Sequence, residues 1–407
     1  MDVVFLSPQY PPEMPHFTRG LAEVGVRVLG IADTPYGSLP ADVRRYLSDY
    51  LQVPSIMDED DVLQRATEWL RNRRTPIDKV LANWEPVMML AARMSEAWGL
   101  PGMSSDAVLG FRDKRVMKER VEAAGLRSPR SERVTSAAEV YAAAERIGYP
   151  LVIKPIAGAG SADTYKVDDL GQLAAIIRKL ERVPEAIVEE YIEGEELTYD
   201  TICIGGEPVY ENVVQYFPKP LEGRSQEWIS PAQLSVRDLS QPSIQKGITL
   251  GRGVMKALGM GDGYTHMEWF LTPKGEAVFG EIACRAGGAK LVDMMNYTSD
   301  VDLYREWARV VCHGTFEGQS ERKYNVGVVF KRAKGRGVIT RIDGLHEFRR
   351  LHGDHLLEET LSRPGTARRD WKQTLLSDGY LTFRHPDWST AQRIAWDAAT
   401  RITMYAQ

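Results

Sequence analysis

One stretch, from His266 to Gly288, constrains the fold of this chain more than any other. Residues 272–275 read Thr-Pro-Lys-Gly, which is typical of a tight turn because proline presets its backbone angle and glycine tolerates a positive φ. Aromatic and β-branched residues on either side predict strands over residues 267–271 and 276–282. The stretch therefore predicts an antiparallel hairpin.

The predicted hairpin carries two carboxylates on one face. We expect Leu271 to pair with Glu276 across the turn. Glu268 then lies opposite Phe279, and Glu281 is a diagonal neighbour on the same face, about 7–8 Å away. Two acids so placed suit Mg²⁺, which takes oxygen ligands and shares them with phosphates. A surface hairpin with solvated acids is the alternative that this stretch alone leaves open.

The same face continues beyond the two acids. His266 precedes Glu268 on it, and Arg285 follows Glu281. An arginine beside two acids indicates an anion clamp next to a metal site. Cys284 falls on the opposite face, which favours a place in the core over a catalytic role.

Composition narrows the class of protein. A chain of 407 residues is too long for one ordinary core and predicts two or three domains. The net charge of -5 gives no reason to expect nucleic acid or an acidic membrane as a partner. Cys203, Cys284 and Cys312 are scattered and odd in number, and no apolar run is long enough to cross a membrane. We therefore expect a cytoplasmic protein without disulfides.

Residues 1 to about 110 alternate strands with helices. Strands are predicted at 3–6, 26–31 and 80–82, and helices at 17–24, 60–72 and 86–98. This alternation predicts a parallel sheet covered by helices. The loop at residues 7–12 follows the first strand, where ligands tend to bind, but it lacks the glycine pattern of a dinucleotide site.

Two lysines mark residues 111 to about 195. A helix is predicted over 113–124 with Asp113 as its cap, and Lys114 then occupies a first turn that disfavours cations. Lys154 interrupts a buried strand at 151–155 and directly precedes the glycine-rich residues 157–161. Backbone N–H groups of such a loop can cradle an anion, so a phosphate is a reasonable partner for Lys154, and the unfavourable place of Lys114 hints at another task for it. A solvated surface lysine is the alternative for Lys114.

Over residues 186–196 a predicted strand runs into an acid-rich bend, and a further strand is predicted at 197–204. An apolar strand end with exposed backbone can pair with the edge of an adenine ring, and Glu196 can hold two ribose hydroxyls. The alternative is an ordinary acidic turn.

The remaining chain is predicted from periodicity. Strands are expected at 207–215, 326–330 and 337–342, helices at 244–258, 300–313 and 390–405, and a polar loop at 217–233. The part after residue 324 could form a small α+β subdomain over an acceptor pocket.

Taken in order, these features resemble the ATP-grasp superfamily, which includes biotin carboxylase and D-alanine–D-alanine ligase. The resemblance implies an ATP-grasp fold that combines α/β and α+β parts. It divides the chain into an N-terminal α/β domain at 1–110 and a lid and nucleotide clamp at 111–195. The C-terminal subdomain, with the Mg²⁺ site and an α+β extension, would occupy 196–407.

The resemblance also implies ATP and Mg²⁺ as cofactors and assigns roles to individual residues. Lys114 and Lys154 would bind the ATP phosphates. The remaining nucleotide contacts would come from the lid, the adenine-binding bend and the ribose-binding acid: Gly158, Gly160 and Ser161; Glu189, Tyr191 and Ile192; and Glu196.

The hairpin supplies the implied metal and substrate contacts. Glu268 and Glu281 would hold Mg²⁺, and Arg285 would stabilise the transferred phosphoryl group, with Lys154 as the other catalytic cation. Many members read Glu-x-Asn-x-Arg here, whereas this chain has Ala283 in place of the asparagine, which leaves open whether one or two ions bind. The continuation Arg-Ala-Gly-Gly, with His266 upstream, is similar instead to L-amino-acid ligases, in which Arg285, His266 and Gly288 would border the substrate.

The activity implied is ATP-dependent ligation of a carboxylate to an amine through an acyl phosphate, releasing ADP and phosphate, with amino-acid-like small molecules as substrates. Two alternatives remain open at this point: phosphorylation or acylation of a different acceptor, and a nucleotide-binding protein without catalysis. Related enzymes are often dimers, so the resemblance also raises a homodimer.

Overall fold

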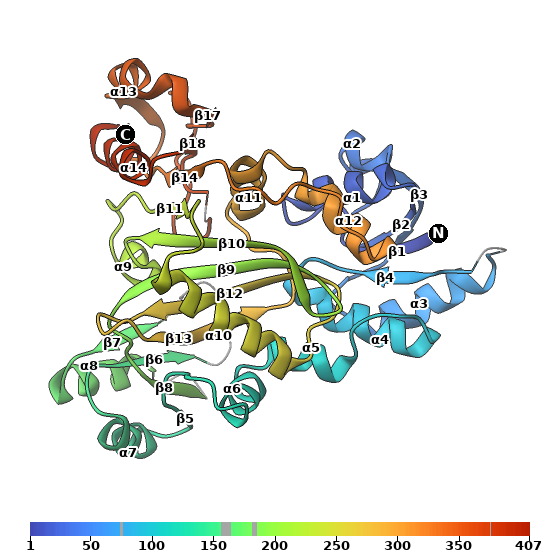
Figure 1. The fold of residues 1–407 in the computed structure, drawn as a ribbon, viewed down its shortest axis with the longest axis horizontal. Coiled ribbons are helices and arrows are strands. Elements are labelled where there is room, and N and C mark those ends of the chain that lie inside the picture. Colours follow the sequence, from blue (N-terminus) through green and yellow to red (C-terminus); the bar gives the residue numbers. More distant parts are fainter. Residues whose placement is uncertain (74–75, 156–163, 181–184, 375) are drawn as a thin grey trace.

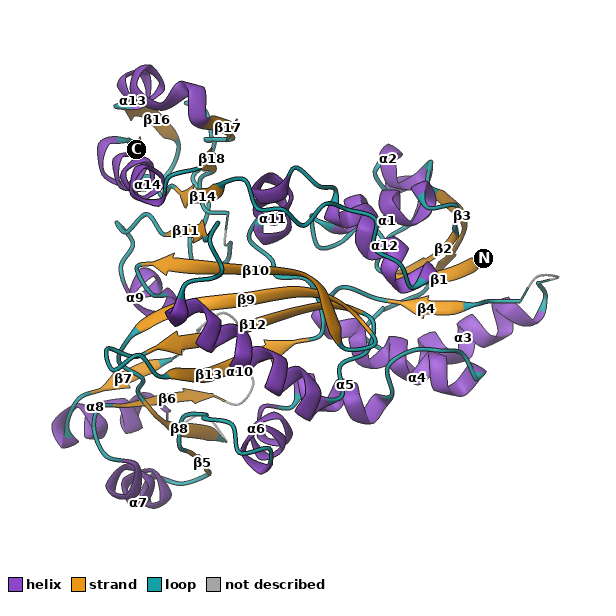
Figure 2. Cartoon of the chain, viewed as in Figure 1, coloured by secondary structure: helices purple, strands orange, loops and turns teal. Residues whose placement is uncertain are grey.

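The computed structural model describes residues 1–73, 76–155, 164–180, 185–374 and 376–407. The described strands form four sheets, of which the largest runs through the middle of the molecule (Figures 1 and 2). No helix within these ranges is long and apolar enough to cross a membrane.

The N-terminal sheet is parallel, in the order β3-β2-β1-β4, as the alternating pattern predicts. Its elements are β1 (Asp2–Leu6), α1 (Met14–Glu23), β2 (Arg27–Ala32), η1 (Tyr36–Ser38), α2 (Ala41–Arg44), β3 (Leu47–Gln52), α3 (Glu59–Arg71), β4 (Lys79–Leu81), η2 (Glu85–Val87) and α4 (Met88–Trp98). β1 is buried along its whole length, which explains its continuous apolar run. β3 was not predicted because its residues are largely polar and partly exposed.

A smaller antiparallel sheet follows, in the order β5-β8-β6-β7. Two helices lead into it, α5 (Ser105–Arg112) and α6 (Lys114–Ala123), and the predicted cap of α6 is confirmed because Asp113 accepts hydrogen bonds from two backbone N–H groups of the first turn. The sheet and its covering helices are β5 (Ser131–Val134), α7 (Ala137–Ile147), β6 (Leu151–Pro155), β7 (Tyr165–Val167), α8 (Leu170–Leu180) and β8 (Ala186–Glu190).

The central sheet has the order β13-β12-β9-β10-β11-β14-β18-β17, and its neighbouring strands are antiparallel. Its strands are β9 (Glu195–Ile204), β10 (Glu207–Phe217), β11 (Ala232–Ser235), β12 (Gly263–Leu271), β13 (Ala277–Ala283), β14 (Asn325–Phe330), β17 (Leu356–Glu359) and β18 (Tyr380–His385). β14, β17 and β18 come from the C-terminal part of the chain, so the tail extends the same sheet that carries the predicted hairpin.

Helix α10 (Pro242–Leu258) crosses the central sheet (Figure 1). Glycines make this close approach possible: a Cβ on Gly247 would lie 2.2 Å from the ring of Trp269, and one on Gly251 would lie 2.2 Å from the ring of Tyr199. Helices α11 (Leu291–Ser299) and α12 (Leu303–His313) follow the hairpin, and α12 packs against α1. This contact joins the hairpin region to the N-terminal sheet.

Two predictions for the tail are wrong in part. The expected loop at 217–233 contains α9 (Pro220–Ser225), and the terminal helix α14 (Trp388–Arg401) stops before Tyr405. The chain ends instead in β19 (Thr403–Ala406), which pairs with β15 (Lys334–Gly335) and β16 (Ile339–Asp343). Met404 and Ala406 are buried while their neighbours are not, which is the period of a strand. The subdomain also contains α13 (Leu345–His352) and η3 (Gly353–His355). The domain boundaries near 110 and 195 stay predictions.

Candidate active site

The hairpin formed by β12 and β13 brings its two glutamates directly opposite each other. Leu271 pairs with Ala277, so the register expected from the turn is wrong by one residue. A β-bulge at Gly280 then adds one residue to β13 and places Glu268 opposite Glu281 rather than on a diagonal. Glycine is required there because a Cβ would lie 2.8 Å from the carbonyl oxygen of Glu268.

These two glutamates line a cavity of about 490 Å³ between the small sheet and the central sheet. The cavity gathers predicted residues that lie far apart in the chain: Lys114, Lys154, Glu189, Tyr191, Ile192, Glu196, Glu268 and Glu281. The predicted lid residues Gly158, Gly160 and Ser161 lie outside the described residues.

Both predicted lysines make ion pairs in the cavity. Nζ of Lys114 lies 2.9 Å from Oε2 of Glu281, which accounts for a cation in the first turn of α6. Nζ of Lys154 lies 3.1 Å from Oε2 of Glu189. Glu189 is also paired with Lys118, which sequence reasoning missed although it lies one turn beyond Lys114 on α6.

Glu189 is held ionised by these two lysines. Burial opposes its ionisation, but Lys154 and Lys118 outweigh burial and lower its pKa to about 2. Burial also lowers the pKa of Lys118, despite the attraction of Glu189. The carboxylate that was expected at the adenine amino group is therefore engaged by two cations, and that predicted contact stays a prediction.

Three carboxyl groups lie close together in the lining of the cavity: Glu196, Glu268 and Glu281. Burial and the nearby Glu268 raise the pKa of Glu196 to about 8. Burial and Glu281 raise the pKa of Glu268 as well. The surrounding protein desolvates Glu281 and opposes its ionisation too, although the side chain is 43% exposed, but the attraction of Lys114 outweighs this and lowers the pKa of that carboxyl. A cluster of acids that repel one another in this way favours the binding of a cation.

The donor set fits Mg²⁺ held jointly by protein and substrate. In the described part of the chain, no group of three or more histidine, cysteine, aspartate and glutamate side chains is arranged to hold a metal ion. Glu268 and Glu281 face each other as a pair, and Mg²⁺ commonly takes one or two carboxylates and completes its shell with phosphate oxygens and water.

His266 lies on the same face as Glu268 and is fixed by a partner that sequence reasoning missed. Its Nδ1 lies 2.6 Å from Oδ1 of Asp200, which is opposite it on β9. Burial would lower the pKa of His266, but the attraction of Asp200 outweighs burial and raises it. The ring therefore carries its proton more readily than a free histidine, and Nε2 lies 4.0 Å from Oε1 of Glu268.

Arg285 lies past the end of β13, outside the lining of this cavity. Its side chain connects the hairpin to the N-terminal sheet. Its Nε donates to Oε2 of Glu85 at 2.8 Å, and its Nη1 donates to the carbonyl of Ala286 at 2.7 Å. The backbone N–H of Ala286 donates to Oδ1 of Asn83 at 2.8 Å. Asn83 and Glu85 follow β4, so the carboxyl end of the parallel sheet faces the hairpin.

The segment after Arg285 packs closely against His266. A Cβ on Gly287 would lie 2.9 Å from Nδ1 of His266, whereas one on Gly288 would meet nothing within 4 Å. Gly288, the predicted substrate border, therefore lies next to open space, one residue beyond the glycine that contacts His266.

The bend after β8 presents an aromatic ring to two cations. Nζ of Lys166 lies 4.6 Å from the ring centre of Tyr191, and Nζ of Lys219 lies 5.2 Å from it. Ile192 beside it is buried. The bend thus combines an apolar residue, an aromatic ring and positive charge at one wall of the cavity, where Lys166 and Lys219 also line it.

Comparison with known proteins agrees with this geometry. Residues 147–293 match the ATP-grasp domain model. The chain is 24% identical over 236 residues to an L-arginine-specific L-amino acid ligase of Bacillus subtilis (56% of each chain), and 24% identical over 257 residues to an alanine–anticapsin ligase of Bacillus subtilis (58% of this chain and 54% of the relative). The chain spans about half the length of the curated relatives it matches.

A solved structure extends the likeness to the whole chain. The crystal structure of an L-amino acid ligase from Bacillus licheniformis superposes with a TM-score of 0.79 and 19% identity, covering 100% of this chain and 98% of that one. Identity at this level shows a shared fold. Residues 147–293 therefore match the ATP-grasp domain, and the whole chain shares the fold of this solved structure.

Proposed function

We propose that this protein is an ATP-dependent carboxylate–amine ligase that forms an amide or peptide bond between amino-acid-like small molecules. The observation that carries the proposal is the pair of opposed glutamates, Glu268 and Glu281, in one cavity with Lys114 and Lys154. The named activities of the two amino acid ligases and the alanine–anticapsin ligase support it.

ATP would occupy the cavity with its triphosphate toward the lysines. Lys114 and Lys154 would bind phosphate oxygens, which requires them to exchange part of their present pairing with Glu281 and Glu189 for contacts to the nucleotide. The adenine would lie along the bend at Tyr191 and Ile192, with the ribose near Glu196. The raised pKa of Glu196 suits this role, because a neutral carboxyl can both donate to and accept from hydroxyls.

Glu268 and Glu281 would hold Mg²⁺, which when bound supplies charge neutralisation for the transferred phosphoryl group. The substrate carboxylate attacks the γ-phosphorus, the bond to the bridging oxygen breaks, and ADP leaves. Arg285 would hold the phosphoryl oxygens of the acyl phosphate, which requires its guanidinium, now bonded to Glu85, to reach into the cavity that it does not line at present. The neutral amine then attacks the acyl carbon, the C–O bond to the phosphoryl group breaks, and the departing phosphate takes up the proton that the nitrogen loses.

The protonation state of His266 decides whether it acts as a base for the amine or orients a substrate. A histidine whose pKa is raised by Asp200 is a poor base for an amine. The Nε2–H of a protonated ring would instead donate to a substrate carboxylate in the open space beside Gly288. We therefore assign His266 to substrate orientation.

The test measures ADP release from the purified protein with ATP, Mg²⁺ and pooled amino acids, followed by mass analysis of the products. The proposal predicts ADP only when a carboxylate and an amine are both present, with a product whose mass is their sum less one water. Arg285→Gln should abolish the product, whereas Arg130→Gln, an exposed arginine, should not. A stable phosphorylated product, or nucleotide binding without turnover for any pool, would contradict the ligase assignment.

A further inference from the structure

A second cavity, of about 480 Å³, lies next to β4 and the start of β12 and has no part in the chemistry described above. Among the described residues it shares no lining residue with the first cavity. Its walls come from β4, the helices α4, α5 and α12, and the segment that leads into β12. It is therefore a pocket between the N-terminal sheet and the central sheet.

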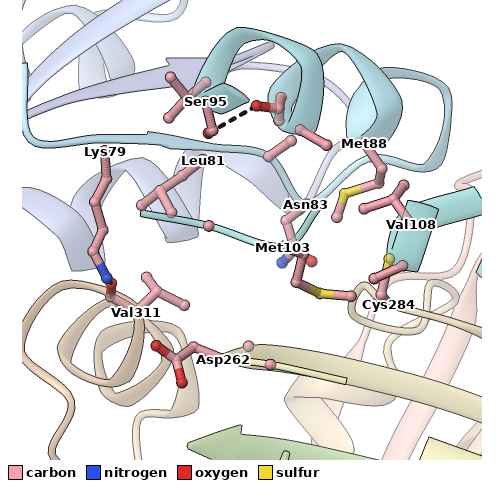
Figure 3. Close-up of a pocket in the computed structure, with 18 of the residues that line it drawn as sticks. Lys79, Leu81, Asn83, Met88, Ser95, Met103, Val108, Asp262, Cys284 and Val311 are labelled. Atoms are coloured by element: carbon pink, nitrogen blue, oxygen red, sulfur yellow. Dashed lines mark hydrogen bonds between the residues drawn. The ribbon is translucent and has the colours of Figure 1, made fainter. Parts of the chain in front are cut away.

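One end of this cavity carries two charged groups of opposite sign (Figure 3). Lys79 donates from Nζ to the carbonyl of Val311 at 2.6 Å, and Asp262 accepts at Oδ1 from the N–H of Gly205 at 2.7 Å. Among the described residues, both side chains make these hydrogen bonds to backbone groups, not to an oppositely charged side chain. A cation and an anion at one end of a pocket match the carboxylate and the ammonium of an α-amino acid.

The opposite end is apolar and rich in sulfur. Figure 3 shows Met88, Met103, Val108 and Cys284 around it. Burial raises the pKa of the Cys284 thiol to about 12, so it acts as a neutral, polarisable wall rather than a nucleophile. Such a wall favours a flexible aliphatic or thioether side chain.

Asn83 supplies a specific contact deep in the pocket. It is 3% exposed and its Oδ1 is fixed by the N–H of Ala286, which settles the orientation of the amide. Its Nδ2 has no hydrogen-bond partner among the described residues. A buried donor without a partner is costly, and a ligand bearing an acceptor would satisfy it.

The backbone of β4 offers further hydrogen bonds. β4 is an edge of the N-terminal sheet, its residues line the cavity, and within the described chain no strand pairs with its outer side. A free strand edge presents N–H and C=O groups to whatever lies beside it.

We propose that this cavity is a second small-molecule site, which takes a free α-amino acid with a methionine-like side chain. The carboxylate of this amino acid lies toward Lys79 and its ammonium toward Asp262. Its side chain lies among Met88 and Met103, where the thioether sulfur accepts a hydrogen bond from Nδ2 of Asn83.

Two short structural links connect this second cavity to the candidate active site. Asn83 holds the backbone of Ala286, and Cys284 directly precedes Arg285. A ligand on Asn83 therefore restrains the segment that positions Arg285.

The experiment titrates L-methionine into the nucleotide-free protein by calorimetry. L-Methioninamide and N-acetyl-L-methionine each lack one charge and should bind at least about tenfold more weakly. Lys79→Gln keeps a donor for Val311, and Asp262→Asn keeps an acceptor for Gly205, and each should weaken L-methionine by a similar factor.

Two further variants separate this site from the active site. Ala107→Phe fills the cavity from α5 and should abolish binding, whereas Leu109→Phe, on the exposed side of the same helix, should leave it unchanged. Hydrogen exchange should slow at residues 79–83 in the wild type on adding L-methionine and not in the Ala107→Phe variant. L-Methionine binding that survives Ala107→Phe, or an absence of binding to a wild type that melts cooperatively, would overturn the proposal.

Discussion

Replacing Glu281 by glutamine removes one negative charge from the candidate metal site and keeps the size of the side chain. At the effective dielectric of about 20 near a protein surface, two unit charges 4 Å apart interact by about 4 kcal/mol, so a divalent ion gains about 8 kcal/mol from one carboxylate. The Glu281 side chain is 43% exposed, and its removal also relieves repulsion on Glu268. We therefore halve the figure to about 4 kcal/mol, which is roughly a thousandfold in Mg²⁺ affinity.

Fluorescent ATP-analogue binding as a function of Mg²⁺ concentration measures this effect without a known substrate. The variant should need roughly a thousandfold more Mg²⁺ for half-saturation. Its melting temperature should change little, because the partly exposed pair with Lys114 contributes about 1 kcal/mol or less. Glu276→Gln, at the exposed turn of the same hairpin, is the matched control and should behave as the wild type.

An unchanged Mg²⁺ midpoint in Glu281→Gln would refute the placement of the metal site. A loss of binding accompanied by a collapse in melting temperature would refute the reasoning differently, since it would show that the pair with Lys114 is structural.

Three further outcomes are expected. The pKa of the Glu196 carboxyl is raised to about 8. Its contribution to the free energy of unfolding is therefore fully present below about pH 4.5, the pKa of the unfolded chain, and is lost as the pH rises through about 8. Glu196→Gln should accordingly raise the melting temperature more at about pH 9 than at about pH 5. Asp200→Asn should lower the pKa of His266 in an NMR titration and destabilise the fold most below pH of about 6.5, because the stability from a raised histidine pKa is lost as pH rises through the folded value. Gly280→Ala should weaken Mg²⁺-dependent nucleotide binding, because the new Cβ would lie 2.8 Å from the carbonyl oxygen of Glu268 and would shift that metal ligand. Melting curves would show whether the hairpin itself survives the substitution.

The sequence predicted the hairpin but not its register. Turn chemistry at residues 272–275 placed the bend correctly, since the N–H of Gly275 donates to the carbonyl of Thr272. The bulge lies at Gly280, and an isolated glycine inside a predicted strand is a local sign of a bulge that the predicted register did not take into account. Alternation of side chains nevertheless kept both glutamates on one face.

Side-chain contacts between distant segments of the chain could not be predicted from the sequence. Lys154 was recognised as a buried lysine that needs a partner, but Glu189 and Lys118 meet it only after the small sheet and α6 have packed together. Asp200 faces His266 because β9 and β12 are neighbours, an order fixed by the whole sheet rather than by either strand.

The N-terminal sheet's contribution to the site was also missed. Glu85 lies just after a predicted strand and before a proline, which marks it as a helix-start residue. Its role as the partner of Arg285 requires the parallel sheet to dock its carboxyl end against the hairpin, which is tertiary information.

The most direct test of the central claim follows oxygen from the substrate carboxylate. With an acid labelled with ¹⁸O in both carboxyl oxygens, an acyl phosphate mechanism transfers one labelled oxygen to the released phosphate and leaves the other in the new amide. Mass analysis of the phosphate should therefore show one ¹⁸O per turnover. Phosphate without the label, formed together with the amide, would contradict activation of the carboxylate by ATP in the cavity of Glu268 and Glu281.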